Sequence, residues 1–258
     1  MKIVVLDDSK TVLLTIQALL EELGVTDDEV SLFCEGHKAL EYIEQHGADI
    51  IFSDINMPGM DGFEFVGRIL ELSHRFVSTL FIVSTDEHYR DINHMKNIGA
   101  KRFIRKPIDA KHFNHFVALE IKKYKSRNKD AISLEIKPSS EAGSSEKIDW
   151  HEELALRMGI KVKHIPRLIE SFTDETKNLS EQLKDAIEYK YYEQIEKYAH
   201  SLKGSSGNMQ FFDLCELSSV MERAAQDTDI AFDYHGHYRL MHQEIETILQ
   251  QLSQHSTH

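Results

Sequence analysis

The sequence has few of the features that mark secreted or membrane proteins. Its 258 residues include only two cysteines, Cys34 and Cys215, whose wide separation suggests neither a disulfide scaffold nor a cysteine metal site. The first apolar run ends after four residues at Asp7 and Asp8, which is too short for the core of a signal peptide. No apolar stretch has the length needed to cross a bilayer. These absences predict a cytoplasmic protein with no membrane partner.

Basic charge is also scarce. The net charge is −13, and residues 148–258 carry 19 acidic side chains against 11 basic ones. A general nucleic-acid binder needs a basic face that displaces counterions from the phosphate backbone. The charge balance therefore predicts that nucleic acid is not a partner.

The first half of the chain alternates apolar runs of strand length with helical patterns. The apolar runs are Ile3–Leu6, Ile50–Ser53 and Leu80–Val83, with weaker runs at 30–33 and 103–104. Continuous apolar runs are typical of a parallel sheet buried on both faces. The helical patterns lie between them, over residues 10–23, 37–46, 61–72, 88–98 and 109–125. Together they predict a doubly wound α/β domain with a five-stranded parallel sheet over residues 1–125.

The second half has helical periodicity only. Four apolar stripes with spacings of three and four residues begin near Ile165, Ile195, Leu214 and Leu240, and a shorter helix begins at Trp150. Such stripes predict an antiparallel four-helix bundle over residues 148–258. Between the halves, residues 126–147 are rich in Ser and charged residues and have too little apolar surface to pack, a composition that predicts a flexible linker.

Polar side chains follow several of the predicted strands, where the reactive groups of an open parallel sheet gather. Asp7 and Asp8 follow the first strand, Asp54 the third, Ser84 the fourth and Lys106 the fifth. Three carboxylates at one corner need a hard cation, and Mg²⁺ prefers such oxygen ligands. One carboxylate is then a candidate nucleophile toward a phosphoryl group, whose oxygens a hydroxyl and an ammonium would hold.

These residues resemble the response-regulator receiver family. The matching segments are Leu6-Asp7-Asp8-Ser9, residues 53–62, Val83-Ser84 and Lys106-Pro107. The resemblance implies a flavodoxin-like fold, with Asp54 as the phosphoacceptor and Mg²⁺ held by Asp7, Asp8, Asp54 and the backbone carbonyl of Asn56. It further implies that Ser84 and Lys106 contact the phosphoryl group and that Ser84 and Phe103 act as the conformational switch. Thr85 stands where the family usually has Ala or Gly, and Asp86 where it varies, so dephosphorylation rates do not carry over.

A phosphatase of the haloacid-dehalogenase type also uses an aspartate nucleophile. It needs two aspartates separated by one residue after the first strand, whereas Asp7 and Asp8 are adjacent and Ser9 follows. The spacing excludes this alternative.

One histidine of the second half has unusual neighbours. On a helical projection His200 lies roughly 130° from the apolar stripe, which predicts a solvent-exposed imidazole, with Gly204 and Gly207 on the same side. Each glycine costs a helix about 0.5–1 kcal/mol relative to Ala, so the pair favours close docking of another protein. Lys203, one turn on, is placed to neutralise a phosphoryl group. The other histidines show no such context.

The segment resembles the histidine phosphotransfer (HPt) family, in which Lys and Gly follow the phosphorylated histidine at +3 and +4. The resemblance implies that His200 is a second phosphoacceptor. Gln210 stands where the family often has Gly, which affects the docking surface and not the proposed phosphosite.

The two resemblances together imply a two-component phosphorelay intermediate, with a sensor histidine kinase and a downstream response-regulator receiver as partners. Neither half resembles a kinase domain, so the expected chemistry is Mg²⁺-dependent self-phosphorylation from phosphodonors and phosphotransfer. Two alternatives stay open: a phosphorylation-controlled interaction switch, and a phosphate sink without onward transfer. The direction of flow between Asp54 and His200 is also open.

Overall fold

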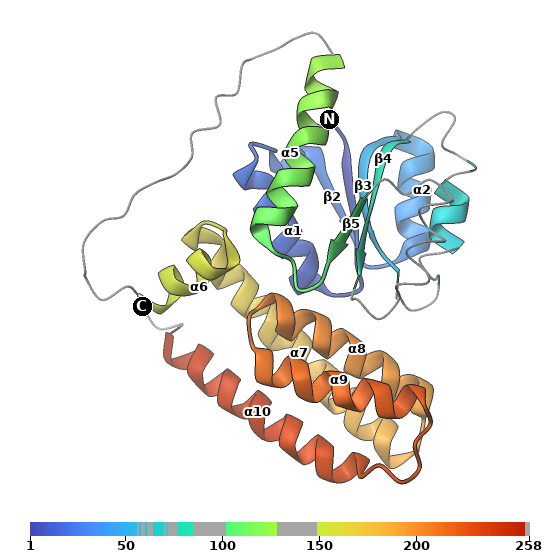
Figure 1. Ribbon diagram of the computed structural model, residues 1–258, viewed down its shortest axis with the longest axis vertical. Helices are drawn as coiled ribbons and strands as arrows, with labels where there is room; N and C mark the ends of the chain where they lie inside the picture. Colours follow the sequence, from blue (N-terminus) through green and yellow to red (C-terminus); the bar gives the residue numbers. More distant parts are fainter. Residues whose placement is uncertain are drawn as a thin grey trace.

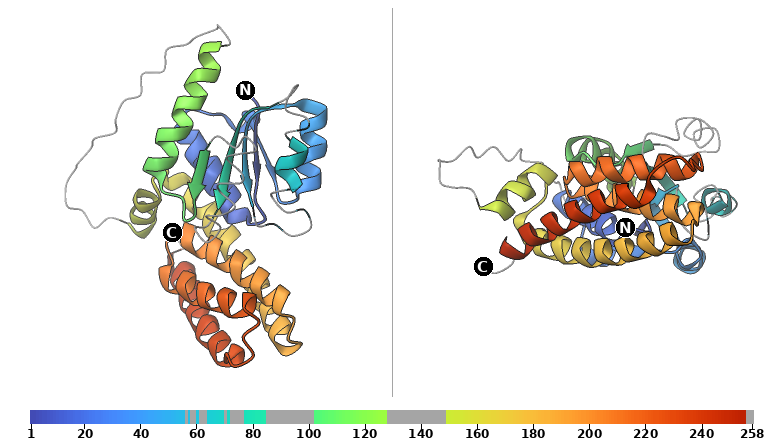
Figure 2. Two further views of the ribbon diagram at one scale, coloured as in Figure 1. Left: turned by 45° about the vertical axis from the view of Figure 1, so that its right-hand side comes forward. Right: turned by 90° about the horizontal axis from the view of Figure 1, so that it is seen from below.

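The computed structural model describes residues 1–55, 57, 60, 64–69, 71, 77–84, 102–127 and 149–255. Several sequence predictions fall elsewhere: the helix over 88–98, the linker beyond Arg127, and the roles of Asn56, Thr85 and Asp86 all lie outside the described residues. Within them, an α/β domain and a helical bundle pack against each other (Figures 1 and 2).

The α/β domain is built on five parallel strands. They are β1 (Ile3–Leu6), β2 (Val30–Phe33), β3 (Ala48–Asp54), β4 (Val77–Ser84) and β5 (Arg102–Arg105). Their order in the sheet is β2-β1-β3-β4-β5, which is the flavodoxin-like order of a doubly wound sheet. The five-stranded fold predicted from the apolar runs is confirmed. The register pairs Leu6 with Ser53 and Asp54 with Val83, so the carboxyl ends of the central strands meet at one edge.

Helices cover both faces of the sheet. One face carries α1 (Lys10–Glu22) and α5 (Ala110–Arg127), and the other carries α2 (Gly36–His46) and the helical residues 64–69 (Figure 1). A short 3₁₀ turn, η1 (Asp27–Glu29), precedes β2. Alternate residues of each strand enter opposite cores: Ile3 and Val5 pack on the α1 side, and Val4 and Leu6 on the α2 side.

The second domain is helical throughout its described residues. It comprises α6 (Trp150–Met158), the 3₁₀ turn η3 (Val162–His164), α7 (Ile165–Glu188), α8 (Tyr192–Asn208), α9 (Phe212–Gln226) and α10 (Tyr234–His255). Helix α7 packs on α8 and α10, and α9 packs on the same two helices, which closes the predicted four-helix bundle (Figure 1). None of the described helices combines the length and hydropathy needed to span a membrane.

The predicted apolar stripes form the core of the bundle with one exception. Leu240 is 55 % exposed, whereas Met241 is fully buried with Ile245, Ile248 and Leu252. The steps from 241 to 252 are four, three and four residues, and these keep one face of a helix toward the core. Leu240 lies about 100° away from that face, so its assignment to the stripe was wrong.

The two domains share one continuous hydrophobic core. Helix α1 packs against α7 and α8, and a single cluster of buried side chains extends from Phe52 and Phe113 of the α/β domain to Phe172 and Leu202 of the bundle. The bundle lies at the carboxyl edge of the sheet (Figure 2). The sequence had predicted both domains without predicting that they dock.

The aromatic stack between the sheet and α5 is expected to be a main stabilising element of the α/β domain. Phe52 is fully buried and its ring centroid lies 4.9 Å from Phe81 and 5.5 Å from Phe113. Phe52→Ala should lower the free energy of unfolding by about 3–5 kcal/mol, because it removes buried apolar atoms and leaves a cavity in the core. Urea denaturation measures the change. The control is Leu119→Ala, at a position 43 % exposed on α5, which should cost less than about 1 kcal/mol; equal losses would contradict this account of the core.

Candidate functional site: a buried acidic corner facing a histidine

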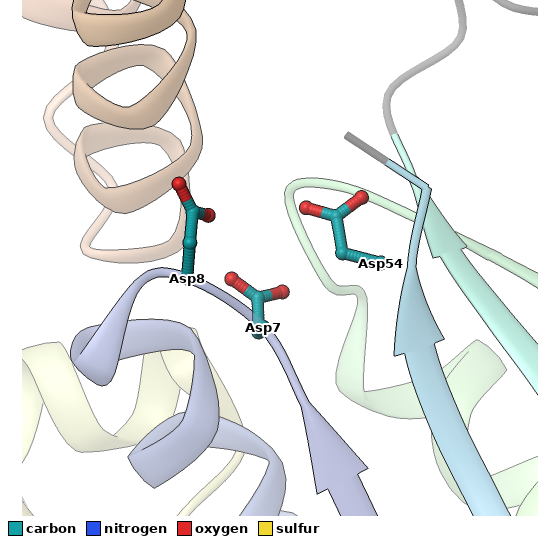
Figure 3. A group of neighbouring side chains, drawn as sticks. All are labelled: Asp7, Asp8 and Asp54. Carbon is teal, nitrogen blue, oxygen red and sulfur yellow. The ribbon is translucent and has the colours of Figure 1, made fainter. Parts of the chain in front are cut away.

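Three carboxylates converge at the carboxyl edge of the sheet. Asp7 and Asp8 follow β1, and Asp54 is the last residue of β3. One oxygen atom from each of the three lies within 4.8 Å of the others, as Figure 3 shows. Asp7 is fully buried and Asp54 is 1 % exposed. The adjacency of β1 and β3 therefore brings together the acids that the sequence places at strand ends.

Lys106 is the cation of this corner. Its backbone N–H donates to the Ser84 carbonyl at 2.8 Å, which fixes the residue just past β5. Its Nζ lies 2.5 Å from Asp54 Oδ2 and 2.8 Å from Asp7 Oδ2. Burial alone would lower the pKa of Lys106, but the neighbouring carboxylates, led by Asp54, raise it above its usual range. The lysine thus stays charged and holds two of the three acids.

The donor set fits a divalent cation. Burial is the main cause that raises the pKa of Asp7 to about 8, and it also raises the pKa of Asp8, with the charge of Asp54 adding to both effects. One ammonium does not balance three clustered carboxylates, and closely spaced carboxylate oxygens are the ligands that Mg²⁺ takes. The described members of the predicted metal set, Asp7, Asp8 and Asp54, are brought together; Asn56 lies outside the described residues.

The two predicted switch residues lie on the strands beside the corner. Ser84 ends β4 and is 5 % exposed. Phe103, in β5, is partly buried and packs against the core on the α2 side of the sheet. Their positions are compatible with the predicted roles, which stay predictions.

His200 does not face solvent. The residue is only 8 % exposed, so the prediction of an open imidazole was wrong for this structure. A helical projection locates the core of a residue's own bundle, and His200 indeed lies off the α8 stripe. The α/β domain covers that outer face, and every residue from Ala199 to Asn208 is buried.

A carboxylate on the neighbouring helix orients the imidazole. Glu222 of α9 lies 2.5 Å from His200 Nδ1 through Oε1, and 2.5 Å from Lys203 Nζ through Oε2. Burial would lower the pKa of His200, but the hydrogen bond and charge of Glu222 raise it above the usual value, with Asp54 adding to the increase. Bonds from His200 and Lys203 in turn hold the pKa of Glu222 low, against the effect of burial. Lys203, predicted to neutralise a phosphoryl group, is paired with Glu222 in this state.

The two glycines predicted to permit docking differ in their surroundings. A Cβ atom at Gly207 would lie 3.3 Å from Cys215 Sγ and 3.5 Å from Pro107 Cβ, and Pro107 belongs to the α/β domain. A Cβ atom at Gly204 would meet nothing within 4 Å. The tighter contact at Gly207 is with Cys215 of α9 in the same bundle, and the Pro107 distance is an ordinary van der Waals contact. Close approach of the other domain therefore does not account for either glycine.

Hydrogen bonds between the domains surround the corner. Ser201 Oγ donates to Asp8 Oδ2 at 2.9 Å, and the Ile108 backbone N–H donates to Asn208 Oδ1 at 2.9 Å. Glu175 Oε2 accepts from the backbone N–H and the hydroxyl of Thr11 at the start of α1. In Figure 3 the Asp8 carboxylate points toward a helix of the bundle, which the Ser201 bond identifies as α8. No local pattern in the sequence predicts a role for Ser201, Asn208, Glu175 or Glu222.

Comparison with protein families agrees with both halves of this arrangement. The model of the response regulator receiver domain matches residues 3–118, and the model of the Hpt domain matches residues 167–255. The chain carries a receiver domain followed by an Hpt domain.

The chain is similar to parts of larger curated proteins. It is 26 % identical over 151 residues to the regulatory protein VanRc of Enterococcus gallinarum, covering 58 % of this chain and 63 % of that protein. It is 25 % identical over 221 residues to the signal transduction histidine-protein kinase BarA of Shigella flexneri, covering 84 % of this chain and 23 % of that protein. The chain thus spans less than two thirds of either relative. Among solved structures, the chemotaxis response regulator CheY4 of Vibrio cholerae aligns with 27 % identity and a TM-score of 0.41, over 46 % of this chain and 97 % of that chain.

The Glu222 carboxylate is expected to control the protonation of His200. Glu222→Gln keeps the shape and removes the charge, so the pKa of His200 should fall. The charges that face the imidazole are Glu222, Lys203, Asp8, Asp54 and Lys106, and only the first changes. Nitrogen-15 NMR titration of the histidine ring measures the shift. Glu216→Gln, at an exposed position of the same helix, is the control; a His200 titration that is the same in all three proteins would refute the role of Glu222.

The acidic corner is expected to bind Mg²⁺ through Asp8. Asp8→Asn removes one charged oxygen ligand and should raise the Mg²⁺ dissociation constant at least roughly tenfold, the equivalent of about 1.4 kcal/mol. Isothermal titration calorimetry on the full chain measures it, with Glu44→Gln, an exposed position on α2, as the control. Unchanged affinity in the Asp8 variant would exclude this residue as a ligand.

Proposed function

We propose that the chain is a two-component phosphorelay intermediate in which Asp54 and His200 exchange a phosphoryl group. The observation that carries the proposal is the position of α8 across the acidic corner. Ser201, the residue after His200, is hydrogen-bonded to Asp8, and the charge of Asp54 acts on the imidazole. This contact supports the proposal because the proposed donor and acceptor lie in elements that meet at one seam within the same molecule.

The exchange is a direct displacement at phosphorus. His200 Nε2 attacks the phosphoryl group on Asp54, the bond between phosphorus and the Asp54 carboxylate oxygen breaks, and a nitrogen–phosphorus bond forms. The imidazole keeps its Nδ1 proton, so the ring becomes cationic, and the Glu222 carboxylate 2.5 Å from Nδ1 stabilises that charge. The reverse reaction follows the same path.

On the receiver side, the residues around Asp54 would assist the transfer of the phosphoryl group to His200. Lys106, now bound to Asp54 and Asp7, would hold phosphoryl oxygens together with Ser84. Mg²⁺ held by Asp7, Asp8, Asp54 and the Asn56 carbonyl would neutralise charge on the transferred group, whose transfer depends mainly on position and electrostatics. Phe103 and Ser84 would report phosphorylation to the rest of the domain.

The protonation state of His200 should make the rate of phosphoryl transfer from Asp54 depend on pH. Only the neutral imidazole has a lone pair on Nε2, and the raised pKa of His200 keeps the cation present to higher pH than for an ordinary histidine. Transfer from Asp54 to His200 should therefore speed up as pH rises through the raised pKa of His200.

Exchange with other proteins needs the domains to separate. Asp54 is 1 % exposed and His200 is 8 % exposed in the docked arrangement, so neither a sensor histidine kinase nor a downstream receiver reaches them there. The docked state serves transfer within the chain, and the separated state serves entry and exit of phosphate. The cytoplasmic location and the absence of nucleic-acid and membrane partners stay predictions from composition.

Substitution of each phosphoacceptor tests the relay. With radiolabelled phosphate supplied through a partner kinase, Asp54→Ala should abolish labelling of both sites when phosphate enters at the receiver. His200→Ala should retain the acid-stable, base-labile label of phosphoaspartate and lose the base-stable label of phosphohistidine. His242→Ala, a histidine elsewhere in the bundle, is the control and should leave both labels intact.

The same experiment separates the alternatives. If His200→Ala leaves labelling of a downstream receiver unchanged, the chain is an interaction switch and not a relay. If both acceptors are labelled and inorganic phosphate accumulates without a labelled downstream receiver, the chain is a phosphate sink.

A further inference from the structure

A segment ahead of the Hpt match lies against the receiver. Residues 149–164, here called the docking segment, comprise α6, Gly159 to Lys161 and η3. The Hpt family match begins only at residue 167, so the docking segment is additional to it. In Figures 1 and 2, α6 lies beside the end of α5 that is nearest the bundle.

The docking segment has an apolar side within the shared core. Leu154, Ala155, Met158 and Ile160 are all buried, and they belong to the same cluster as Ile108 and Val117 of the receiver. The segment therefore adds to the seam between the domains as well as to the bundle.

A glycine sets the distance between the docking segment and the receiver. Gly159 ends α6 with φ of +69°, a conformation that favours glycine. A Cβ atom there would also lie 2.3 Å from Ala110 Cβ, at the start of α5. The backbone at Gly159 thus rests directly on the first residue of α5.

Charged side chains join the docking segment to α1. Lys163 pairs with Glu21, His164 Nε2 lies 3.0 Å from the same carboxylate, and Lys161 Nζ lies 3.3 Å from Glu22. The Lys163 hydrogen bond lowers the pKa of Glu21, and burial lowers the pKa of His164. The pairs lie at the far end of α1 from Asp7 and Asp8. They bear on docking without taking part in the chemistry.

We propose that the docking segment holds the chain's own Hpt domain on its own receiver and thereby excludes the Hpt domain of another molecule from Asp54. This deepens the proposed function, since it names the partner that Asp54 meets first and the contact that selects it. The contact at Lys163 and Glu21 requires complementary charges, and the contact at Gly159 and Ala110 requires small size.

Transfer between two differently disabled chains tests this selection. The donor chain carries His200→Ala and keeps Asp54; the acceptor chain carries Asp54→Ala and keeps His200. With the donor phosphorylated by acetyl phosphate, label on the acceptor measures transfer between molecules. It should be slow, because the donor's own bundle occupies its receiver.

Charge reversal at Lys163 of the donor should make its Asp54 more accessible to the acceptor chain. Adding Lys163→Glu places two carboxylates together and should raise transfer between molecules about three- to fivefold, the effect of a partly exposed ion pair. Adding Glu21→Lys as well restores a complementary pair and should return transfer to the slow rate. Lys184→Glu, the same change at an exposed position of α7, should have no effect.

A variant with a larger side chain at the contact should also separate the donor's bundle from its receiver. Ala110→Leu should force α5 away from Gly159 and speed transfer between molecules, whereas Lys111→Leu, at the neighbouring exposed position, should not. Small-angle X-ray scattering of the unphosphorylated chains reports docking independently: Lys163→Glu and Ala110→Leu should increase the radius of gyration, and the double charge reversal should restore it.

The outcomes separate this proposal from the phosphorelay itself. If Lys163→Glu leaves both transfer between molecules and the radius of gyration unchanged, or if Glu21→Lys fails to reverse its effect, the docking segment does not select the partner. If the acceptor stays unlabelled even with phosphorylated donors that carry Lys163→Glu or Ala110→Leu, and scattering still changes as expected, the docking contact stands and the phosphorelay fails.

Discussion

The structure depends on one buried arrangement of charges at the seam between two domains. On the receiver side, Lys106 pairs with two of three clustered carboxylates; on the bundle side, Glu222 holds His200 and Lys203. In each domain, burying these charged groups without a compensating partner would cost free energy. The hydrogen bond from Ser201 to Asp8 joins the two sides. Asp8, a proposed ligand of Mg²⁺, therefore also takes part in the contact between the domains.

Docking creates a conflict that a relay protein must resolve. The closed arrangement brings the Asp54 and His200 sites together, and it also buries both of them. In the proposed relay, a phosphoryl group would move within the chain only when the domains are together, and would pass to or from another protein only when they are apart. Ion pairs at the edge of the seam, such as Lys161 with Glu22, are partly exposed and contribute little each. Such contacts permit a closed state that reopens.

Much of this arrangement could be predicted from the sequence. The features that could not be predicted depend on contacts between the two domains or between helices. The apolar runs predict five parallel strands, and the carboxyl ends of the adjacent strands β1 and β3 then bring Asp7, Asp8 and Asp54 to one edge. The exposure of His200 was predicted wrongly, because helical periodicity describes packing within one bundle and carries no information on a second domain. Glu222 was missed since it lies 22 residues away from His200 in sequence, in a helix whose local pattern is ordinary.

The central claim is that Asp54 and His200 exchange phosphate within one docked molecule. Rapid-quench measurement of phosphohistidine formation, after brief phosphorylation of the receiver, tests it most directly when repeated over a hundredfold range of protein concentration. The account predicts a first-order rate constant that does not depend on concentration. A rate that rises in proportion to concentration, or phosphoaspartate that decays without any phosphohistidine, would contradict it.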